Sequence, residues 1–477
     1  MKNRLKFGFS LVFGLPFLGL VLNLAKWGSG CFHALDLGIY QQAILDLAFT
    51  SSWNPLNTVR GIPIFADHFD PIILLAAALQ RVIGPHAWFP IVFEFLVYYL
   101  GGVIAFLLMK DRVLGVRLAL TSLWFFCTGM AVAFRYPVHP TTWSALPILM
   151  LAHSLKSRKQ GSVFFWLNFL CLFKEYFPIC FASYAVYLLM TRRFRVAALG
   201  FVNGGLWLWV DFVLRPRLFS DFHGHGNDLL RELLEHPFSK IASSFLAFDW
   251  KGSVASLLPF LVLLPYVARH EKDREWWLAL GAYMLPVFGI QFLFGNIGFQ
   301  YGAPVSAFFL SLVLLGDFNW KSSVQLLVLW SRRILLFSVV WLTGDFVNKT
   351  LEFFSPKVNH CRYQGTKMYE VLEVGKIVSA VHSESAILAS GGLVPVVIGP
   401  NRKVYQYGIW SKIQESYDFL VLGRNNTSDL YPFGAEYYEK VIASCRPLAS
   451  EVLMDTKNVF LARGRFTEEC LHQRHPF

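Results

Sequence analysis

Long apolar stretches, separated by short polar gaps, occupy most of the chain between residues 7 and 348. A helix that crosses a bilayer needs about 20 mainly apolar residues, and fewer where neighbouring helices surround it. Pro147 and Pro178 lie in two of the shorter stretches, so these spans are expected to be tilted or partly irregular. The pattern predicts about eleven spans, which lie near residues 7–25, 88–109, 113–132, 141–155, 161–174, 177–190, 196–214, 242–266, 276–294, 300–316 and 334–348.

The first apolar stretch, residues 7–25, follows a basic N-terminal segment, as the apolar part of a signal peptide would. The small residues of a cleavage site do not follow it cleanly, because Lys26 and Trp27 interrupt the sequence there. We therefore expect an uncleaved first span.

Two gaps, roughly residues 26–87 and 215–241, are longer than simple connections. Within the first gap, residues 37–49 have helical periodicity, and residues 71–82 form an apolar run that is too short to cross a membrane. Both runs fit helices that lie in or near the membrane interface.

From about residue 350 the pattern changes to short β-rich stretches, such as 386–389, 419–422 and 459–462, between polar helical stretches and turns. This pattern predicts a small α/β domain over residues 351–477, with a core of its own. The expected fold is therefore a polytopic α-helical membrane domain over residues 1–350, followed by this C-terminal domain.

The composition excludes an ordinary soluble protein, because 55% of the residues are hydrophobic and 16% are charged, with a mean hydropathy of +0.46. The net charge of +12 would suit a nucleic-acid partner, but no RNA- or DNA-binding motif accompanies it. The chain has no G-x-x-x-x-G-K-[ST] motif, which argues against an ATP-driven pump.

The basic residues determine the expected orientation. They gather in alternate gaps, at Lys2/Arg4/Lys6, Lys110/Arg112/Arg117, Lys156/Arg158/Lys159, Arg192/Arg193/Arg195, Arg269/Lys272/Arg274 and Lys321/Arg332/Arg333. Short loops rich in Lys and Arg stay on the cytoplasmic side. We therefore expect a cytoplasmic N-terminus, and the odd number of spans then makes the C-terminal domain extracytoplasmic.

Cysteines are too few and too scattered for a disulfide framework. Three of them lie inside predicted spans and are expected to be packing residues: Cys127, Cys171 and Cys180. In the tail, one pair among Cys361, Cys445 and Cys470 could form a disulfide in an oxidising compartment, and the spacing does not select which pair.

Asp36 follows the first span, in a gap on the predicted outer side. An aspartate at a helix start often caps free backbone N–H groups. A carboxylate in a partly dry outer cleft could instead act as a general base toward a hydroxyl. Tyr40 and Gln41, farther along the same segment, are candidates to contact the substrate.

The segment Asp67-His68-Phe69-Asp70-Pro71 combines two carboxylates and an imidazole. These groups could bind a divalent cation, form an acid–base pair or position a substrate. Asp70-Pro71 also fits an ordinary helix start, because proline is favoured at the first helical position.

Arg135, His139, Lys174 and Glu175 lie at the outer ends of predicted spans. Such groups could snorkel to the interface, or Arg135, His139 and Lys174 could converge on a phosphate or pyrophosphate.

The second long gap carries Arg215 and Arg217, followed by His223 and His225. Two histidines alone are a weak metal signal, and a solvated loop is the simpler interpretation. Tyr301 opens a late span, where it could hydrogen-bond a sugar or anchor the helix at the interface.

Four segments, ALDLGIYQQAILDLA, ADHFDPIILLAAALQ, FRYPVHPTTWSALPILMLAH and LFKEYFPI, resemble an uncharacterised family of bacterial multipass membrane proteins. That family is recognised by D-x-G-x-x-x-Q, H-F-x-P, H-P and K-E motifs in this order. The similarity covers about residues 30–350 and is weaker in the tail. The family in turn resembles the GT-C glycosyltransferases, which take a sugar from a polyprenyl-phosphate carrier and attach it to an acceptor outside the cytoplasm.

The resemblance implies a glycosyltransferase of the bacterial inner membrane, with a polyprenyl-phosphate sugar as donor and a glycan, lipid or protein as acceptor. It places Asp36 at the position of the catalytic acidic residue, between two interfacial helices. Residues matching the family's phosphate-binding cations are Arg135, His139 and Lys174, and less securely Arg215 and Arg217. Asp36 lacks the paired-acid motif of GT-C enzymes, so a divalent cation is an open question.

The mechanism that follows is a single displacement at the anomeric carbon, with inversion. Asp36 would deprotonate the acceptor hydroxyl, His68 would orient Asp36 or the sugar, and the cations would stabilise the departing phosphate.

The alternatives are a transporter of lipid-linked sugars or phospholipids, or a non-enzymatic envelope scaffold. A transporter would place charges at the centres of its spans and show inverted repeats. Here the charges lie mostly at the outer ends, with Glu94 and Asp211 as partial exceptions, and no repeat is visible.

Overall fold

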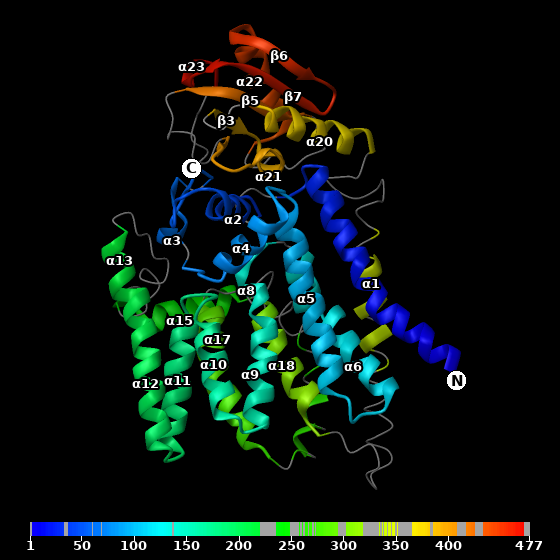
Figure 1. Ribbon diagram of the computed structural model, residues 1–477, viewed down its shortest axis with the longest axis vertical. Helices are drawn as coiled ribbons and strands as arrows, with labels where there is room; N and C mark the ends of the chain where they lie inside the picture. Colours follow the sequence, from blue (N-terminus) through cyan, green and yellow to red (C-terminus); the bar gives the residue numbers. More distant parts are fainter. Residues whose placement is uncertain are drawn as a thin grey trace. The chain divides into compact units, whose positions relative to one another are not determined.

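The computed structural model describes most of the chain (Figure 1). The described ranges are 2–32, 37–59, 61–67, 69–135, 138–219, 235–248, 273–293, 302–317, 365–381, 385–407, 416–424 and 433–471, with further positions between 257 and 271 and between 333 and 351.

The chain divides into two compact units. The first consists of Met1–Phe17, Phe65–Ile72 and Glu94–Val347, and the second of Leu18–Ile64, Ile73–Phe93 and Asn348–Phe477. The first long gap is thus grouped largely with the C-terminal residues. The domain boundary at residue 350 stays a prediction.

Helices make up the described part of the first unit. Two helices, α1 (Lys2–Gly28) and α5 (Phe89–Leu108), contribute residues to both units. The other helices are α6 (Leu114–Phe126), α7 (Thr128–Arg135), α8 (Pro140–Trp143), α9 (Ala145–Lys156), α10 (Gln160–Leu170), α11 (Phe177–Met190), α12 (Phe194–Trp209), the π-helix η2 (Val210–Leu214), α13 (Arg215–Leu218), α15 (Pro237–Ala247), α17 (Glu275–Leu293) and α18 (Gly302–Leu315).

Among the described residues, four helices are long and apolar enough to cross a membrane, namely Lys6–Gly28, Phe89–Leu108, Phe194–Leu218 and Glu275–Leu293. The pair α6 and α7 passes the same test together, with a bend of 46°. Cys127 has an extended backbone between them, which interrupts the helix there. The polytopic helical fold is therefore confirmed. The predicted spans 242–266 and 334–348 lie partly outside the described residues, so the number of eleven stays a prediction.

The packing of α11 against α12 depends on small residues. A Cβ atom at Gly200 would lie 2.9 Å from Ala185 Cβ, and one at Gly204 would lie 3.3 Å from the backbone nitrogen of Ala182. Small residues four positions apart allow two helix backbones to approach closely, as membrane helices often do.

The N-terminal part of the second unit contains two helices that pack together, α2 (Ile39–Phe49) and α4 (Ile73–Ile83). They correspond to the two expected interfacial runs, which are confirmed as helices. A short hairpin of β1 (Leu56–Asn57) and β2 (Ile62–Pro63) lies between them in sequence, followed by α3 (Ile64–Asp67). The apolar side chains of Leu74, Leu75 and Val82 on α4 are exposed, as expected of an interfacial helix.

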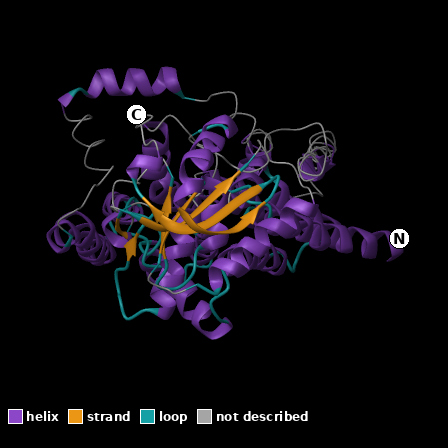
Figure 2. Cartoon of the chain, turned by 90° about the horizontal axis from the view of Figure 1, so that it is seen from above, coloured by secondary structure: helices purple, strands orange, loops and turns teal. Residues whose placement is uncertain are grey.

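The predicted α/β region is confirmed in the C-terminal part (Figure 2). Five strands are ordered β4-β3-β5-β7-β6, with parallel pairing of β3 to β4 and β5 and antiparallel pairing of β7 to β5 and β6. The elements are α20 (Gly365–Ser379), β3 (Ala386–Ala389), η4 (Gly391–Leu393), α21 (Val394–Val397), β4 (Lys403–Gln406), β5 (Tyr417–Gly423), α22 (Ala435–Cys445), η7 (Arg446–Leu448), β6 (Ala449–Asp455), β7 (Val459–Phe466) and α23 (Glu468–Leu471).

The structure shows which of several cysteines form disulfides and which are free. Cys445 at the end of α22 is bonded to Cys470 on α23, which selects one of the pairs that the spacing left open. Cys127, Cys171 and Cys180 are free and buried, as expected of packing residues. Cys31 is also disulfide-bonded.

Candidate functional site

A cluster of charged side chains in the first unit is assembled from three segments that are distant in sequence: residues 65–72, 171–176 and 210–218. The first two segments are joined by a hydrogen bond from Ile72 N to Leu172 O, 3.0 Å long. The second segment is the turn between α10 and α11, and the third is the irregular end of the span that begins with α12.

Lys174 lies among carboxylates in this cluster. Its side chain is 9% exposed, and Nζ lies 3.8 Å from Asp70 Oδ2 and 3.9 Å from Glu175 Oε2. Glu175 also faces Arg215, with 3.2 Å between Oε1 and Nη1, and accepts a hydrogen bond from Phe69 N at 3.5 Å. Both of these distances are ion-pair distances, longer than those of a direct hydrogen bond.

Arg215 is buried and holds the backbone of the neighbouring segment. Its Nε donates to Phe65 O at 2.8 Å, and its Nη2 donates to Ala66 O at 3.3 Å and Asp67 O at 3.0 Å. Three consecutive carbonyls are thus fixed by one guanidinium group, directly before His68. Only the planar, multiply donating group of arginine can serve such a set.

Asp211 is a further member of the cluster that sequence reasoning did not place in the site. It lies on η2, is 2% exposed, and interacts electrostatically with Glu175, Arg215 and Asp70. Neither of its carboxylate oxygens accepts a hydrogen bond from the described residues. A π-helical turn is rare and often marks a functional site, and a buried carboxylate normally has hydrogen-bond partners. Asp211 is unusual in both respects. The sequence does contain a signal for Asp211, because it is an ionisable residue inside an apolar stretch.

His139 is buried in a different environment. Its backbone N donates to Glu94 Oε2 at 2.9 Å, and Trp143 Nε1 donates to the same oxygen at 3.1 Å. The imidazole Nδ1 accepts from Thr141 N at 3.4 Å, at the start of α8. These contacts give His139 the role of a helix cap beside a buried glutamate.

The remaining candidates lie in other surroundings. The half-buried Arg135 donates from Nε to Ala131 O on its own helix at 3.2 Å, and Arg217 is exposed on α13. Tyr40 and Gln41 are buried in the second unit, on α2.

Asp36, His68 and Tyr301 lie outside the described residues. Their roles, and the substrate-binding roles of the other candidates, stay predictions. Within the described ranges, no group of three or more His, Cys, Asp or Glu side chains could hold a metal ion.

Comparison with known proteins gives the family of the chain and a solved structure of similar fold. A family model described as "Predicted membrane protein (DUF2079)" matches residues 31–430. No curated protein matches the chain. Among solved structures, the chain is similar to the crystal structure of ArnT from Cupriavidus metallidurans bound to undecaprenyl phosphate, with a TM-score of 0.55 and 12% sequence identity. The match covers 95% of this chain and 98% of that one, so the likeness extends over the whole fold and confirms the expected GT-C architecture.

Proposed function

This chain belongs to the DUF2079 family of predicted membrane proteins, and from this premise we propose that it is a membrane glycosyltransferase with a polyprenyl-phosphate sugar as donor. The fold supports the proposal, because it is similar over nearly its full length to ArnT, whose structure contains undecaprenyl phosphate. The proposed location is the bacterial inner membrane, with transfer at its extracytoplasmic face and a glycan, lipid or protein acceptor.

The observation that carries the proposal is the buried position of Lys174. Its side chain is 9% exposed, and its ammonium group lies beside Asp70 and Glu175, at 3.8 and 3.9 Å from their nearest oxygens, so a buried positive charge is in place for a phosphate oxygen. Charge-assisted hydrogen bonds to phosphate are strong where water is excluded. We assign to Lys174 the stabilisation of the phosphate that leaves with the polyprenyl chain.

Arg215 and Asp211 take different roles in this proposal. Since the Arg215 guanidinium already serves three carbonyls and Glu175, it positions the segment before His68. Asp211 offers two buried acceptor oxygens, which suit the hydroxyl groups of the transferred sugar.

We assign the role of general base to Asp36 because of the family resemblance. Asp36 takes the proton of an acceptor hydroxyl, the acceptor oxygen attacks the anomeric carbon, and the bond from that carbon to the phosphate oxygen breaks. One displacement inverts the anomeric configuration, and the polyprenyl phosphate leaves with the bonding electrons.

A lipid-linked-sugar transporter is the second candidate. The buried Asp211 favours it, because an ionisable residue inside the candidate span Phe194–Leu218 also suits a substrate pathway. A transporter moves the lipid-linked sugar across the membrane intact, whereas a transferase moves the sugar to an acceptor. The experiment below distinguishes these two outcomes.

The test begins with mass spectrometry of the lipids that co-purify with the full chain. We expect polyprenyl phosphate, free or glycosylated, in the wild type and in the control Lys376→Gln, an exposed lysine on α20. Lys174→Gln should reduce this lipid about tenfold or more. Bulk phospholipid alone in all three samples would contradict the proposed donor.

A second step separates catalysis from binding. Asp36→Asn should retain the lipid and abolish transfer of the sugar, while Asp111→Asn, a change at an exposed aspartate, should leave transfer intact. Transfer that persists in Asp36→Asn would remove Asp36 from the catalytic role. A wild type that moves the lipid-linked sugar across the membrane intact would instead establish the transporter.

A further inference from the structure

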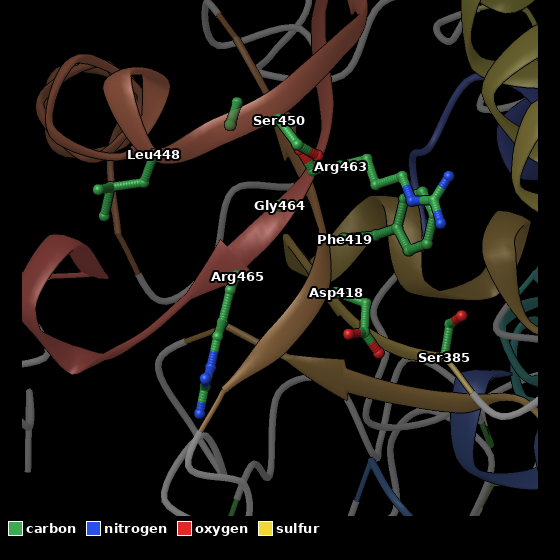
Figure 3. Close-up of a pocket in the computed structure, with 9 residues that line it drawn as sticks. Ser385, Asp418, Phe419, Leu448, Ser450, Arg463, Gly464 and Arg465 are labelled. Atoms are coloured by element: carbon green, nitrogen blue, oxygen red, sulfur yellow. The ribbon is translucent and has the colours of Figure 1, made fainter.

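A pocket of about 590 Å³ opens at one end of the five-stranded sheet (Figure 3). Its wall is built by the starts of β5 and β6, the end of β7 and the residue before β3, all within the second unit. Cavities of this size are typical of sites for small molecules.

Two arginine side chains give the pocket lining its positive charge. Arg463 and Arg465 line it, and neither forms an ion pair within the part of the chain that the structure describes. Arg424 and Arg446, on the same domain, both pair with Asp455, with 2.8 Å between Arg424 Nη1 and Oδ1. The two guanidinium groups at the pocket are thus available for an anion.

Hydroxyl and carboxylate groups accompany these cations. Asp418 accepts a hydrogen bond from Ala386 N through Oδ2 at 2.8 Å, which keeps its carboxylate at the pocket wall. Ser450 donates to Arg463 O at 3.1 Å, and Ser385 supplies a second hydroxyl. Such groups can exchange hydrogen bonds with the hydroxyls of a polyol.

The backbone around the pocket is irregular. The strand register shifts between Tyr417 and Phe419 on β5 and between Ala449 and Glu451 on β6. Bulges of this kind redirect side chains and are frequent beside functional sites.

A glycine completes the wall. At Gly464 a Cβ atom would lie 2.8 Å from Leu448 O and 3.1 Å from Ala449 Cα, so the close approach of β7 to the start of β6 requires glycine there. In Figure 3 the side chains of Arg463 and Arg465, on either side of this glycine, extend in different directions. A ligand that contacts both is therefore larger than a simple ion.

We propose that this pocket binds an anionic carbohydrate, that is, a sugar that carries a carboxylate or a phosphate group. Guanidinium groups recognise both anions through paired hydrogen bonds, and Asp418 with the serines can recognise the hydroxyls. The proposal goes beyond sugar transfer and does not depend on it, because it concerns the chemistry of the C-terminal domain alone.

The test uses the full chain in lipid nanodiscs and three probes that share one hexose ring: glucuronic acid, glucose 6-phosphate and glucose. Binding is measured by saturation-transfer NMR. We expect at least one of the two anions to bind and glucose to bind much more weakly, with affinity that falls as salt is added. Comparison of the two anions identifies the preferred acidic group.

Variants connect binding to the pocket. The double variant Arg463→Gln/Arg465→Gln should weaken binding of the preferred anion about tenfold or more. Lys440→Gln, a change at an exposed cation on α22 outside the pocket lining, should bind like the wild type. An unchanged melting temperature and an intact Cys445–Cys470 bond establish that the variants are folded, and Arg465→Gln alone serves if the double variant is not.

Either of two results would overturn the proposal: no binding of either anion up to about 10 mM, or equal binding by the wild type and the folded arginine variant.

Discussion

The Arg215 guanidinium donates hydrogen bonds to three consecutive backbone carbonyls, and a lysine at this position could satisfy only part of that set. Arg215→Lys keeps the charge near Glu175 but leaves at least one of the carbonyls of residues 65–67 without its donor. We expect the free energy of unfolding to fall by about 1.5–3 kcal/mol. Thermal denaturation of the purified protein measures this change.

The matched control for this prediction is Arg217→Lys, two positions along the same short helix. Arg217 is exposed, so its replacement should leave the melting temperature almost unchanged. Equal melting temperatures for wild type, Arg215→Lys and Arg217→Lys would show that the carbonyl contacts do not hold the segment.

At the level of elements, the interface of α11 and α12 depends on the absence of side chains on one face of α12. Gly200→Leu would force a side chain against Ala185, whose Cβ lies 2.9 Å from the expected Cβ position. Overpacking of this kind costs about 1–3 kcal/mol, so the melting temperature should fall.

Gly205 provides the comparison for the same helix. Apart from the neighbouring backbone of its own helix, no atom of the described residues lies within 4 Å of a Cβ built there, so Gly205→Leu removes a glycine from the helix interior without creating a clash with them. Its melting temperature should equal or exceed that of the wild type, because leucine favours helix more than glycine does. If the two leucine variants melted alike, close packing at Gly200 would have no part in stability.

Most elements could be predicted from the sequence because their signals are local. The strand segments 386–389, 419–422 and 459–462 all fall within observed strands, and the two interfacial runs fall on α2 and α4. The bend at Cys127 was not predicted, because residues 113–132 form one continuous apolar run in the sequence. The interruption comes from the extended backbone of Cys127, which the apolar pattern does not reveal.

At the scale of the whole molecule, the second unit is built from segments more than 300 residues apart. Thr58 Oγ1 donates to Val404 O at 2.5 Å, and Asp46 Oδ1 accepts from Asn401 N at 3.0 Å. The residues after the first span are therefore tied to the C-terminal sheet.

Asp46 makes the stability of this unit depend on pH. Burial raises the pKa of its carboxyl group from 3.8 to about 7, and the hydrogen bond from Asn401 opposes that rise only in part. Between these values the folded chain keeps a proton that the unfolded chain has released. The contribution of Asp46 to the free energy of unfolding is thus largest below about pH 4 and decreases until about pH 7.

The variant Asp46→Asn tests this dependence, because asparagine keeps an acceptor oxygen for Asn401 N and does not titrate. Its stability relative to the wild type should increase between about pH 4 and pH 7, by on the order of 4 kcal/mol. Chemical denaturation at several pH values measures the difference. A stability difference between Asp46→Asn and the wild type that stays constant over this pH range would refute the raised pKa.

The sequence by itself determined the membrane class, the positions of most helices and strands, and the kinds of chemical group at the span ends. These properties follow from local hydrophobicity, periodicity and charge, which neighbouring residues express together. Only the tertiary structure decided that Asp70, Lys174, Asp211 and Arg215 share one cluster, that His139 caps a helix beside Glu94, and that Cys445 pairs with Cys470. Such contacts join residues far apart in the chain, and their choice depends on how helices and strands pack rather than on any local pattern.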